Sequence, residues 1–161
     1  MANNYTMFSE GIEDLTPEEK EWINNIPTRE DFEDSSLYSD DDWDKGFIQA
    51  LKDYGLDTND VEDTIDDFPY FEHLIQENLW WLYAEESVYF EHVACLVQAF
   101  IKKFRPDYIF KITWCEYCDK PRIGEFGGGW VVVSKDEIIY GNAYKEVDEI
   151  TEALKTGNFK C

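Results

Sequence analysis

The pattern of apolar and polar positions changes along the chain from helical spacing to alternation. Apolar residues recur every three or four positions in 40–54 and in 87–104, which predicts two amphipathic helices. Residues 108–114 alternate between apolar and polar side chains, and 130–133 and 137–140 are β-branched or aromatic runs joined by a polar turn. The pattern therefore predicts helices in the first part of the chain and strands in the second.

Capping signals mark the ends of several predicted helices. Thr16, followed by Pro17 and then by Glu19, is typical of a capping-box start. Gly55 and Gly157 stand where a helix would end in a left-handed residue. These signals define one helix that begins after Thr16 and two helices that end before a glycine.

Together these elements predict an α+β fold in a single domain spanning 1–161. We expect acidic helices in the N-terminal part, 1–70, followed by a small antiparallel sheet packed by helices in an α+β core, 71–161. The lead-in 1–15 is expected to be irregular or a short strand. The other expected elements are a short helix or turn at 59–66, a strand at 79–83, and a last helix at 147–154 that covers the sheet.

The charge is distributed very unevenly. The 161 residues include 36 Asp and Glu against 14 Lys and Arg, a formal net charge of −22. Residues 1–100 hold 26 of the acidic and 4 of the basic residues, so the whole excess lies there. This charge argues against nucleic acid binding through phosphate contacts and against docking on anionic membranes. Two explanations remain: a solvated, solubilising face, or a surface that attracts a cationic partner.

The carboxylates are densest between Glu30 and Asp67. On a helix, carboxylates three or four residues apart are separated by about 5–6 Å, close to the phosphate spacing along one nucleic acid strand. We therefore expect a binding protein rather than an enzyme, one that mimics nucleic acid charge and inhibits a basic nucleic-acid-binding protein. The expected partner-binding residues are Glu30, Asp31, Glu33, Asp34, Asp40, Asp41, Asp42, Asp44, Asp57, Asp60, Glu62, Asp63, Asp66 and Asp67.

The segment 118–129 supports an alternative, a small enzyme or ligand-binding domain with an anion site. Backbone N–H groups of consecutive glycines can cradle an anion beside basic side chains. The candidate anion-site residues are Lys120, Arg122, Gly127, Gly128 and Gly129, with Cys118 or Glu125 as the working group. The Walker pattern is missing, and the glycines precede a strand rather than a helix. A tight start of a strand explains the same glycines structurally.

The remaining motifs predict no metal or cofactor. Cys115 and Cys118 form one C-x-x-C pair, but a zinc site needs a second pair of ligands. The segment 40–51 opens like a calcium loop and lacks its glycine and its final glutamate. Each histidine, His73 and His92, ends a Tyr-Phe-Glu-His tetrapeptide on a predicted helix, and neither belongs to a triad. We attach no structural meaning to this single repeat.

Three motifs lie outside the acidic segment: Tyr-Thr-Met-Phe-Ser-Glu at 5–10, Leu-Trp-Trp-Leu-Tyr-Ala-Glu-Glu at 79–86, and Cys-x-Lys-Pro-Arg-x-x-Glu-Phe-Gly-Gly-Gly at 118–129. Together they resemble an uncharacterised family of small acidic proteins of phages, plasmids and bacterial genomes. The resemblance implies no catalytic residues. It implies a mobile element in a bacterial host, and with it host-defence evasion such as anti-restriction or anti-CRISPR inhibition.

The location in the cell follows from what the sequence lacks. The first residues have neither the basic nor the apolar region of a signal peptide. No apolar run approaches the roughly 18 residues that a membrane span requires. We therefore expect a cytoplasmic protein with no membrane contact.

Overall fold

The computed structural model describes residues 2–28, 31, 43–56 and 68–158. Of the expected partner-binding residues, only Asp31 and Asp44 lie in this part of the chain. Asp31 is exposed. The other expected partner-binding residues and the element expected at 59–66 lie outside the described residues.

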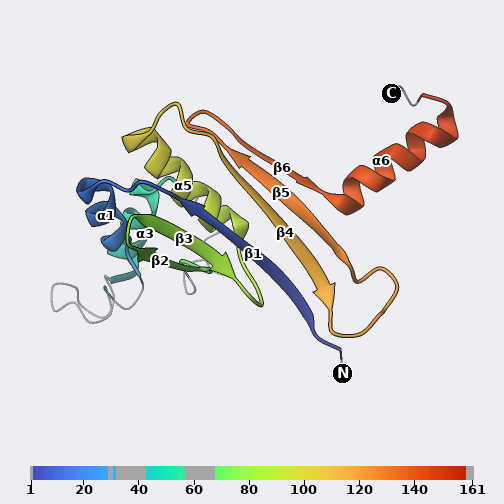
Figure 1. The fold of residues 1–161 in the computed structure, drawn as a ribbon, viewed down its shortest axis with the longest axis horizontal. Helices are drawn as coiled ribbons and strands as arrows, with labels where there is room; N and C mark the ends of the chain where they lie inside the picture. The colour runs from blue at the N-terminus through green and yellow to red at the C-terminus, as the bar shows by residue number, and fades with distance from the viewer. Residues whose placement is uncertain (1, 29–30, 32–42, 57–67, 159–161) are drawn as a thin grey trace.

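A six-stranded antiparallel sheet dominates the described fold (Figure 1). Its strands are β1 (Asn4–Ile12), β2 (Glu72–Gln76), β3 (Leu79–Ala84), β4 (Phe110–Cys118), β5 (Gly127–Val133) and β6 (Ile138–Asn142). Their order across the sheet is β2-β3-β1-β4-β5-β6, and each neighbouring pair is antiparallel. The strands expected at 79–83, 108–114, 130–133 and 137–140 are confirmed as β3 to β6.

The expected fold class is wrong about the relation between helices and sheet. We expected acidic helices followed by a small sheet, but the chain starts with β1, which lies inside the sheet between β3 and β4. The helices lie between or after the strands, and the sheet is the dominant element. The length and central place of β1 could not be predicted from its own sequence, because its partners lie far along the chain: Phe8 pairs with Ala84, and Met7 with Cys115.

The described helices are α1 (Pro17–Asn24), α3 (Trp43–Asp53), α5 (Phe90–Phe104) and α6 (Ala143–Thr156). The capping box of α1 is confirmed, because the Thr16 side chain accepts the Glu19 N–H and the Glu19 carboxylate accepts the Thr16 N–H. Gly157 follows α6 with a φ of 71°, as a left-handed helix end requires. No membrane-spanning helix is found in the described part of the chain.

The core lies on the face of the sheet that α1 and α5 cover. The Trp80 ring from β3 lies 5.4 Å from Phe100 of α5, and Phe90 stacks on Trp114 of β4 at 4.0 Å between ring centroids. Leu96 and Val131 are fully buried in the same cluster. This confirms that the apolar face of the 87–104 helix packs against the sheet, where each fully buried large side chain contributes about 1.5–3 kcal/mol.

The last helix does not cover the sheet as expected. No residue of α6 is buried. Figure 1 shows α6 projecting beyond β6, at the end of the molecule opposite to α1 and α3. The helix itself is confirmed, but its apolar side faces solvent rather than the core.

Candidate functional site

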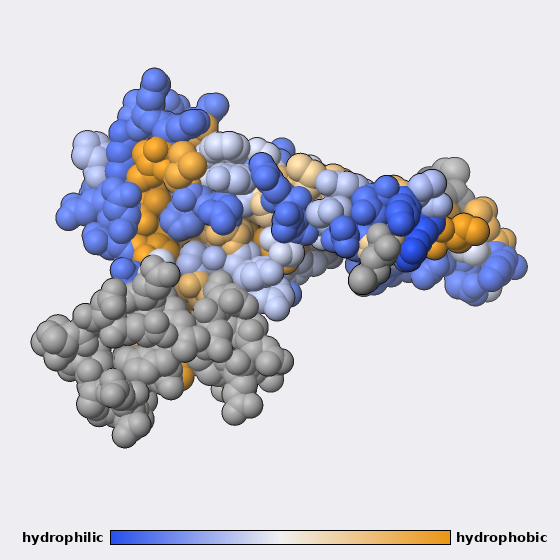
Figure 2. All heavy atoms as spheres, turned by 90° about the horizontal axis from the view of Figure 1, so that it is seen from below, coloured by the Kyte–Doolittle hydropathy of each residue, from blue (hydrophilic) through white to orange (hydrophobic). Residues whose placement is uncertain are grey.

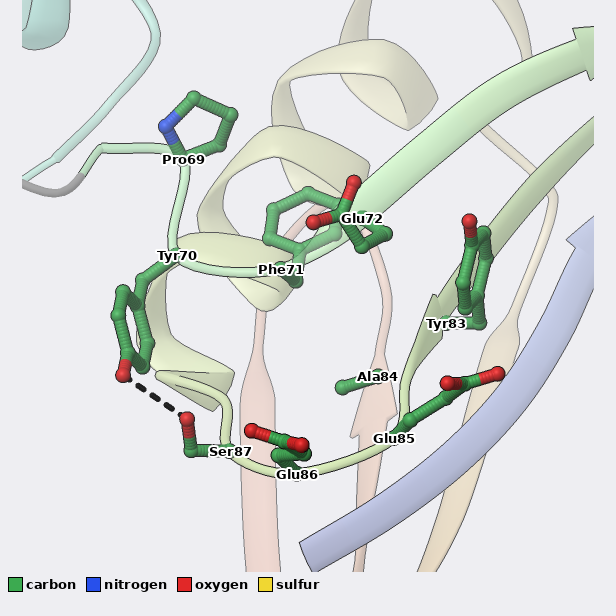
Figure 3. A pocket seen from close by; sticks show the side chains of 9 residues that line it. All are labelled: Pro69, Tyr70, Phe71, Glu72, Tyr83, Ala84, Glu85, Glu86 and Ser87. Atoms are coloured by element: carbon green, nitrogen blue, oxygen red, sulfur yellow. Dashed lines mark hydrogen bonds between the residues drawn. The ribbon is translucent and has the colours of Figure 1, made fainter.

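A cleft of about 480 Å³ lies where β2 and β3 meet the segment that leads into α5 (Figure 3). Residues 69–72 form one wall and residues 83–87 form the other. Three exposed carboxylates line it, those of Glu72, Glu85 and Glu86, together with the rings of Tyr70 and Tyr83. The cleft is therefore both acidic and aromatic.

Hydrogen bonds join the two walls to each other and one of them to β1. The hydroxyl groups of Tyr70 and Ser87 lie 2.8 Å apart (Figure 3), and the Thr6 N–H of β1 donates to the Glu86 carbonyl at 2.9 Å. Glu72 lies directly opposite Tyr83 in the β2–β3 ladder. The three carboxylates are thus carried by a strand and a tethered segment, which fixes the spacing between the walls.

The two copies of the tetrapeptide Tyr-Phe-Glu-His meet at this cleft. The Tyr70 N–H donates to Nδ1 of buried His92 at 3.0 Å, and the Tyr89 N–H donates to the Tyr70 carbonyl at 3.1 Å. The rings of Tyr70 and Tyr89 lie 4.6 Å apart. The repeat, to which we attached no structural meaning, therefore joins the start of β2 to the start of α5.

We expected both histidines on helices, but His73 is not on one. His73 lies in β2, and its Nδ1 accepts a hydrogen bond from Trp80 Nε1 at 3.3 Å. Burial lowers the pKa of His73, because the charged imidazolium is poorly solvated there. His73 is thus a neutral structural residue of the core face.

No ion pair neutralises the cleft among the described residues. The ion pairs found in this part of the chain join Arg105 to Glu19, Arg122 to Glu125, Lys145 to Glu149 and Lys155 to Glu152. A guanidinium or ammonium group in the cleft could form charge-assisted hydrogen bonds with Glu72, Glu85 or Glu86. The faces of Tyr70 and Tyr83 add a cation–π attraction. The cleft therefore suits a cationic side chain.

A second cavity, of about 530 Å³, lies between α3 and α5. Lys52, Lys102 and Lys103 line it together with Asp53. Its charge is opposite to that of the cleft, so it does not suit the same ligand.

The three glycines of the candidate anion site lie in a paired strand. Gly127, Gly128 and Gly129 begin β5 and face β4 in register. A Cβ atom on Gly128 would lie 2.4 Å from the Trp114 carbonyl oxygen, and one on Gly129 would lie 2.3 Å from the Trp114 ring. Close packing against Trp114 therefore explains why these positions need glycine.

The basic residues and the cysteine of the candidate anion site are either exposed or already in contact with Glu125. Lys120 is exposed, and Arg122 Nη1 lies 3.8 Å from Glu125 Oε1. Contact with the Glu125 carboxylate raises the pKa of the Cys118 thiol, which keeps it protonated and poorly nucleophilic. Cys115 is exposed while Cys118 is buried, as expected for residues on opposite faces of β4. The C-x-x-C pair is thus not a juxtaposed dithiol.

The residues of the cleft were missed by the sequence analysis. Glu85 and Glu86 stood within a recognised motif and the tetrapeptide repeat contained Tyr70 and Glu72, but only the β2–β3 pairing brings them together.

Among the described residues, no group of three or more His, Cys, Asp or Glu side chains could hold a metal ion. Comparisons with family models, with curated proteins and with solved structures give no match for this chain.

Proposed function

We propose that the protein is an acidic binding protein that occupies the nucleic-acid-binding surface of a basic partner. One observation carries this proposal: three exposed carboxylates, of Glu72, Glu85 and Glu86, surround one cleft without a counter-charge from the described residues. The cleft belongs to the hundred-residue segment that holds the whole net charge of −22. Charge of one sign in a cleft attracts ligands of the opposite sign.

The chemistry of the partner follows from that of the cleft. Proteins that bind nucleic acid present arginine and lysine side chains to phosphate oxygens. An arginine seated between Glu72 and Tyr83 would exchange a phosphate for a carboxylate and gain contact with an aromatic face. The carboxylates between 30 and 67 add attraction for further cations of the same surface.

The cellular setting remains part of the proposal. The motifs at 5–10, 79–86 and 118–129 resemble small acidic proteins of phages, plasmids and bacteria. A cytoplasmic protein of a mobile element that blocks a DNA-binding defence nuclease would need this charge.

The anion-site alternative has weaker support. Two of the three glycines that would cradle an anion, Gly128 and Gly129, are packed against Trp114 within the sheet, and the raised pKa of the Cys118 thiol favours its protonated form. Neither observation favours an enzyme. A binding function therefore accounts better for the described geometry.

Competition with DNA tests the proposal. The full chain is immobilised, proteins are captured from a bacterial lysate at low salt, and each captured protein is purified and tested for DNA binding. We expect a captured protein to bind duplex DNA, and the acidic protein to displace that DNA in proportion to its concentration. Simultaneous binding of DNA and the acidic protein by every captured partner would contradict the proposal.

A further inference from the structure

An apolar seam runs along α6 and is exposed throughout. Val147 is 60% exposed, Ile150 47% and Leu154 63%, and none of the helix residues is buried. With Ala143 they follow the spacing four, three, four, which is the a/d pattern of a coiled-coil seam. A contiguous exposed apolar strip of this kind marks an interaction surface.

The first turn of α6 is anchored, so the helix is held away from the core. The Tyr144 hydroxyl donates to the carbonyl oxygens of Gly124 at 3.0 Å and Phe126 at 2.7 Å, and Trp130 Nε1 donates to Glu146 at 2.8 Å. Figure 1 shows the remaining turns leading away from the sheet, and Figure 2 shows hydrophobic side chains at that end of the molecule. The seam therefore has no partner within the described fold.

The charges around the seam restrict what can cover it. At 100° per residue, the positions beside the seam are Tyr144, Glu146, Thr151 and Ala153. Of these only Glu146 is charged, and Trp130 already donates to it. The other charged side chains of α6 lie on the far side of the helix: Lys145, Asp148, Glu149, Glu152 and Lys155. The seam thus offers no charge to select a charged partner.

The rest of the chain makes a second copy an acceptable partner. Residues 101–161 carry ten acidic and ten basic residues, whereas the excess of −22 lies in 1–100. Two copies that meet through α6 bring their neutral parts together, and α1, which carries three glutamates against one lysine, lies at the opposite end (Figure 1). An anionic surface would be repelled by the whole molecule.

The seam is also complementary to itself. When two α6 helices pack antiparallel about a two-fold axis, Ala143 of one copy faces Leu154 of the other, and Val147 faces Ile150. The small Ala143 then opposes the larger Leu154 at each end of the contact, as interdigitated packing requires, and Val147 and Ile150 form apolar pairs at its centre. We propose that α6 is the contact between two copies of this chain, packed antiparallel through this seam. This inference is independent of the proposed function.

Sedimentation equilibrium of the full chain over a wide concentration range tests the contact. We expect the mass to rise from 19.0 kDa towards twice that value. The double substitution Val147→Asp and Leu154→Asp should abolish the rise, whereas Ile123→Asp, a control at a fully exposed position outside α6, should leave it unchanged. A monomer at every concentration, or a dimer that survives the double substitution, overturns the proposal.

A mixing experiment tests the antiparallel register and does not depend on one variant. Val147→Asp and Ile150→Lys chains should each associate poorly alone. Mixed together they should associate more strongly, because the new Asp of one chain then faces the new Lys of the other. Circular dichroism of each variant should show the helix content of the unaltered chain. Folded variants that gain nothing on mixing contradict the register and with it the proposed contact.

Discussion

Arg105, at the end of α5, donates two hydrogen bonds to the carboxylate of Glu19, which lies in the first turn of α1. Nε lies 2.8 Å from Oε1 and Nη2 lies 2.9 Å from Oε2. The same guanidinium donates to the carbonyl oxygens of Glu13 and Asp14 at 3.0 Å each. Arg105 thus ties α5 to the connection between β1 and α1, and its hydrogen bond is the main reason that the pKa of Glu19 is lowered.

Replacement of Arg105 should destabilise the fold. Arg105→Ala leaves a buried carboxylate and two carbonyl groups without their donor, which should lower the free energy of unfolding by about 2–3 kcal/mol. Arg105→Lys keeps the charge but not the paired geometry, so its free energy of unfolding should lie between those of the unaltered chain and Arg105→Ala. Urea unfolding measures both, and Lys102→Ala, an exposed position in the same turn, should change stability by less than about 0.5 kcal/mol. An Arg105→Ala protein as stable as the unaltered chain would show that the link is dispensable.

The triple glycine gives a second prediction. Gly129→Ala should lower stability by about 1–3 kcal/mol, because the new Cβ meets the Trp114 ring and, at 2.6 Å, the Gly141 carbonyl oxygen. Gly128→Ala meets the Trp114 carbonyl oxygen and should behave alike. Gly127→Ala should cost less, because its Cβ meets only the Tyr144 side chain and no backbone atom, so the strain can be relieved at the expense of the Tyr144 hydrogen bonds to Gly124 and Phe126. Thermal unfolding of the three variants checks this order, and three equal, negligible effects would refute the packing role.

The half-buried histidine of β2, His73, predicts a dependence of stability on pH. Because the folded-state pKa of His73 lies below its ordinary value of 6.5, the unfolded chain takes up a proton first as the pH falls. His73 therefore contributes full stability above pH 6.5 and loses it below, down to its folded-state pKa. When the pH is lowered from about 7.5 to about 5.5, the urea midpoint of unfolding should fall more for the unaltered chain than for His73→Gln. An identical fall in both proteins would exclude His73 as the cause.

Local signals in the sequence predicted local structure well. The capping box at Thr16 and the helix end at Gly157 are both present in the structure, because each depends on residues within one helical turn. The strand β1 was underestimated, because Phe8 is fixed by Ala84 and Met7 by Cys115, contacts that no local pattern encodes. His73 was placed on a helix for a related reason, since its neighbours fit either period until β3 pairs with them.

The candidate site was less predictable than the fold. The charge asymmetry pointed to a cationic partner, but Glu72 and Glu86 come together only through the pairing of β2 with β3 and the Thr6 hydrogen bond. The amphipathic pattern of α6 was correctly recognised as a helix. It could not show that Tyr144 would hold the helix away from the sheet.

The central claim is that carboxylates of the acidic half bind a basic partner. For a partner captured as described, surface plasmon resonance across a range of salt concentrations measures association and dissociation rates. We compare the unaltered chain with Glu72→Gln/Glu85→Gln/Glu86→Gln and with a matched control, Asp107→Asn/Asp136→Asn/Glu137→Gln, whose residues are exposed in the neutral half. The Asp40, Asp41, Asp42 and Asp44 to Asn variant tests the segment that lies mostly outside the described residues.

We predict an association rate that falls steeply with salt, because exposed charges are screened within about 8–10 Å at physiological ionic strength. The cleft variant should weaken binding at least about tenfold, or about 1.4 kcal/mol, and the control should not. The Asp to Asn variant should mainly slow association. Binding that ignores salt and survives the cleft variant and the Asp to Asn variant, yet is lost with Lys120→Ala and Arg122→Ala, would contradict the claim.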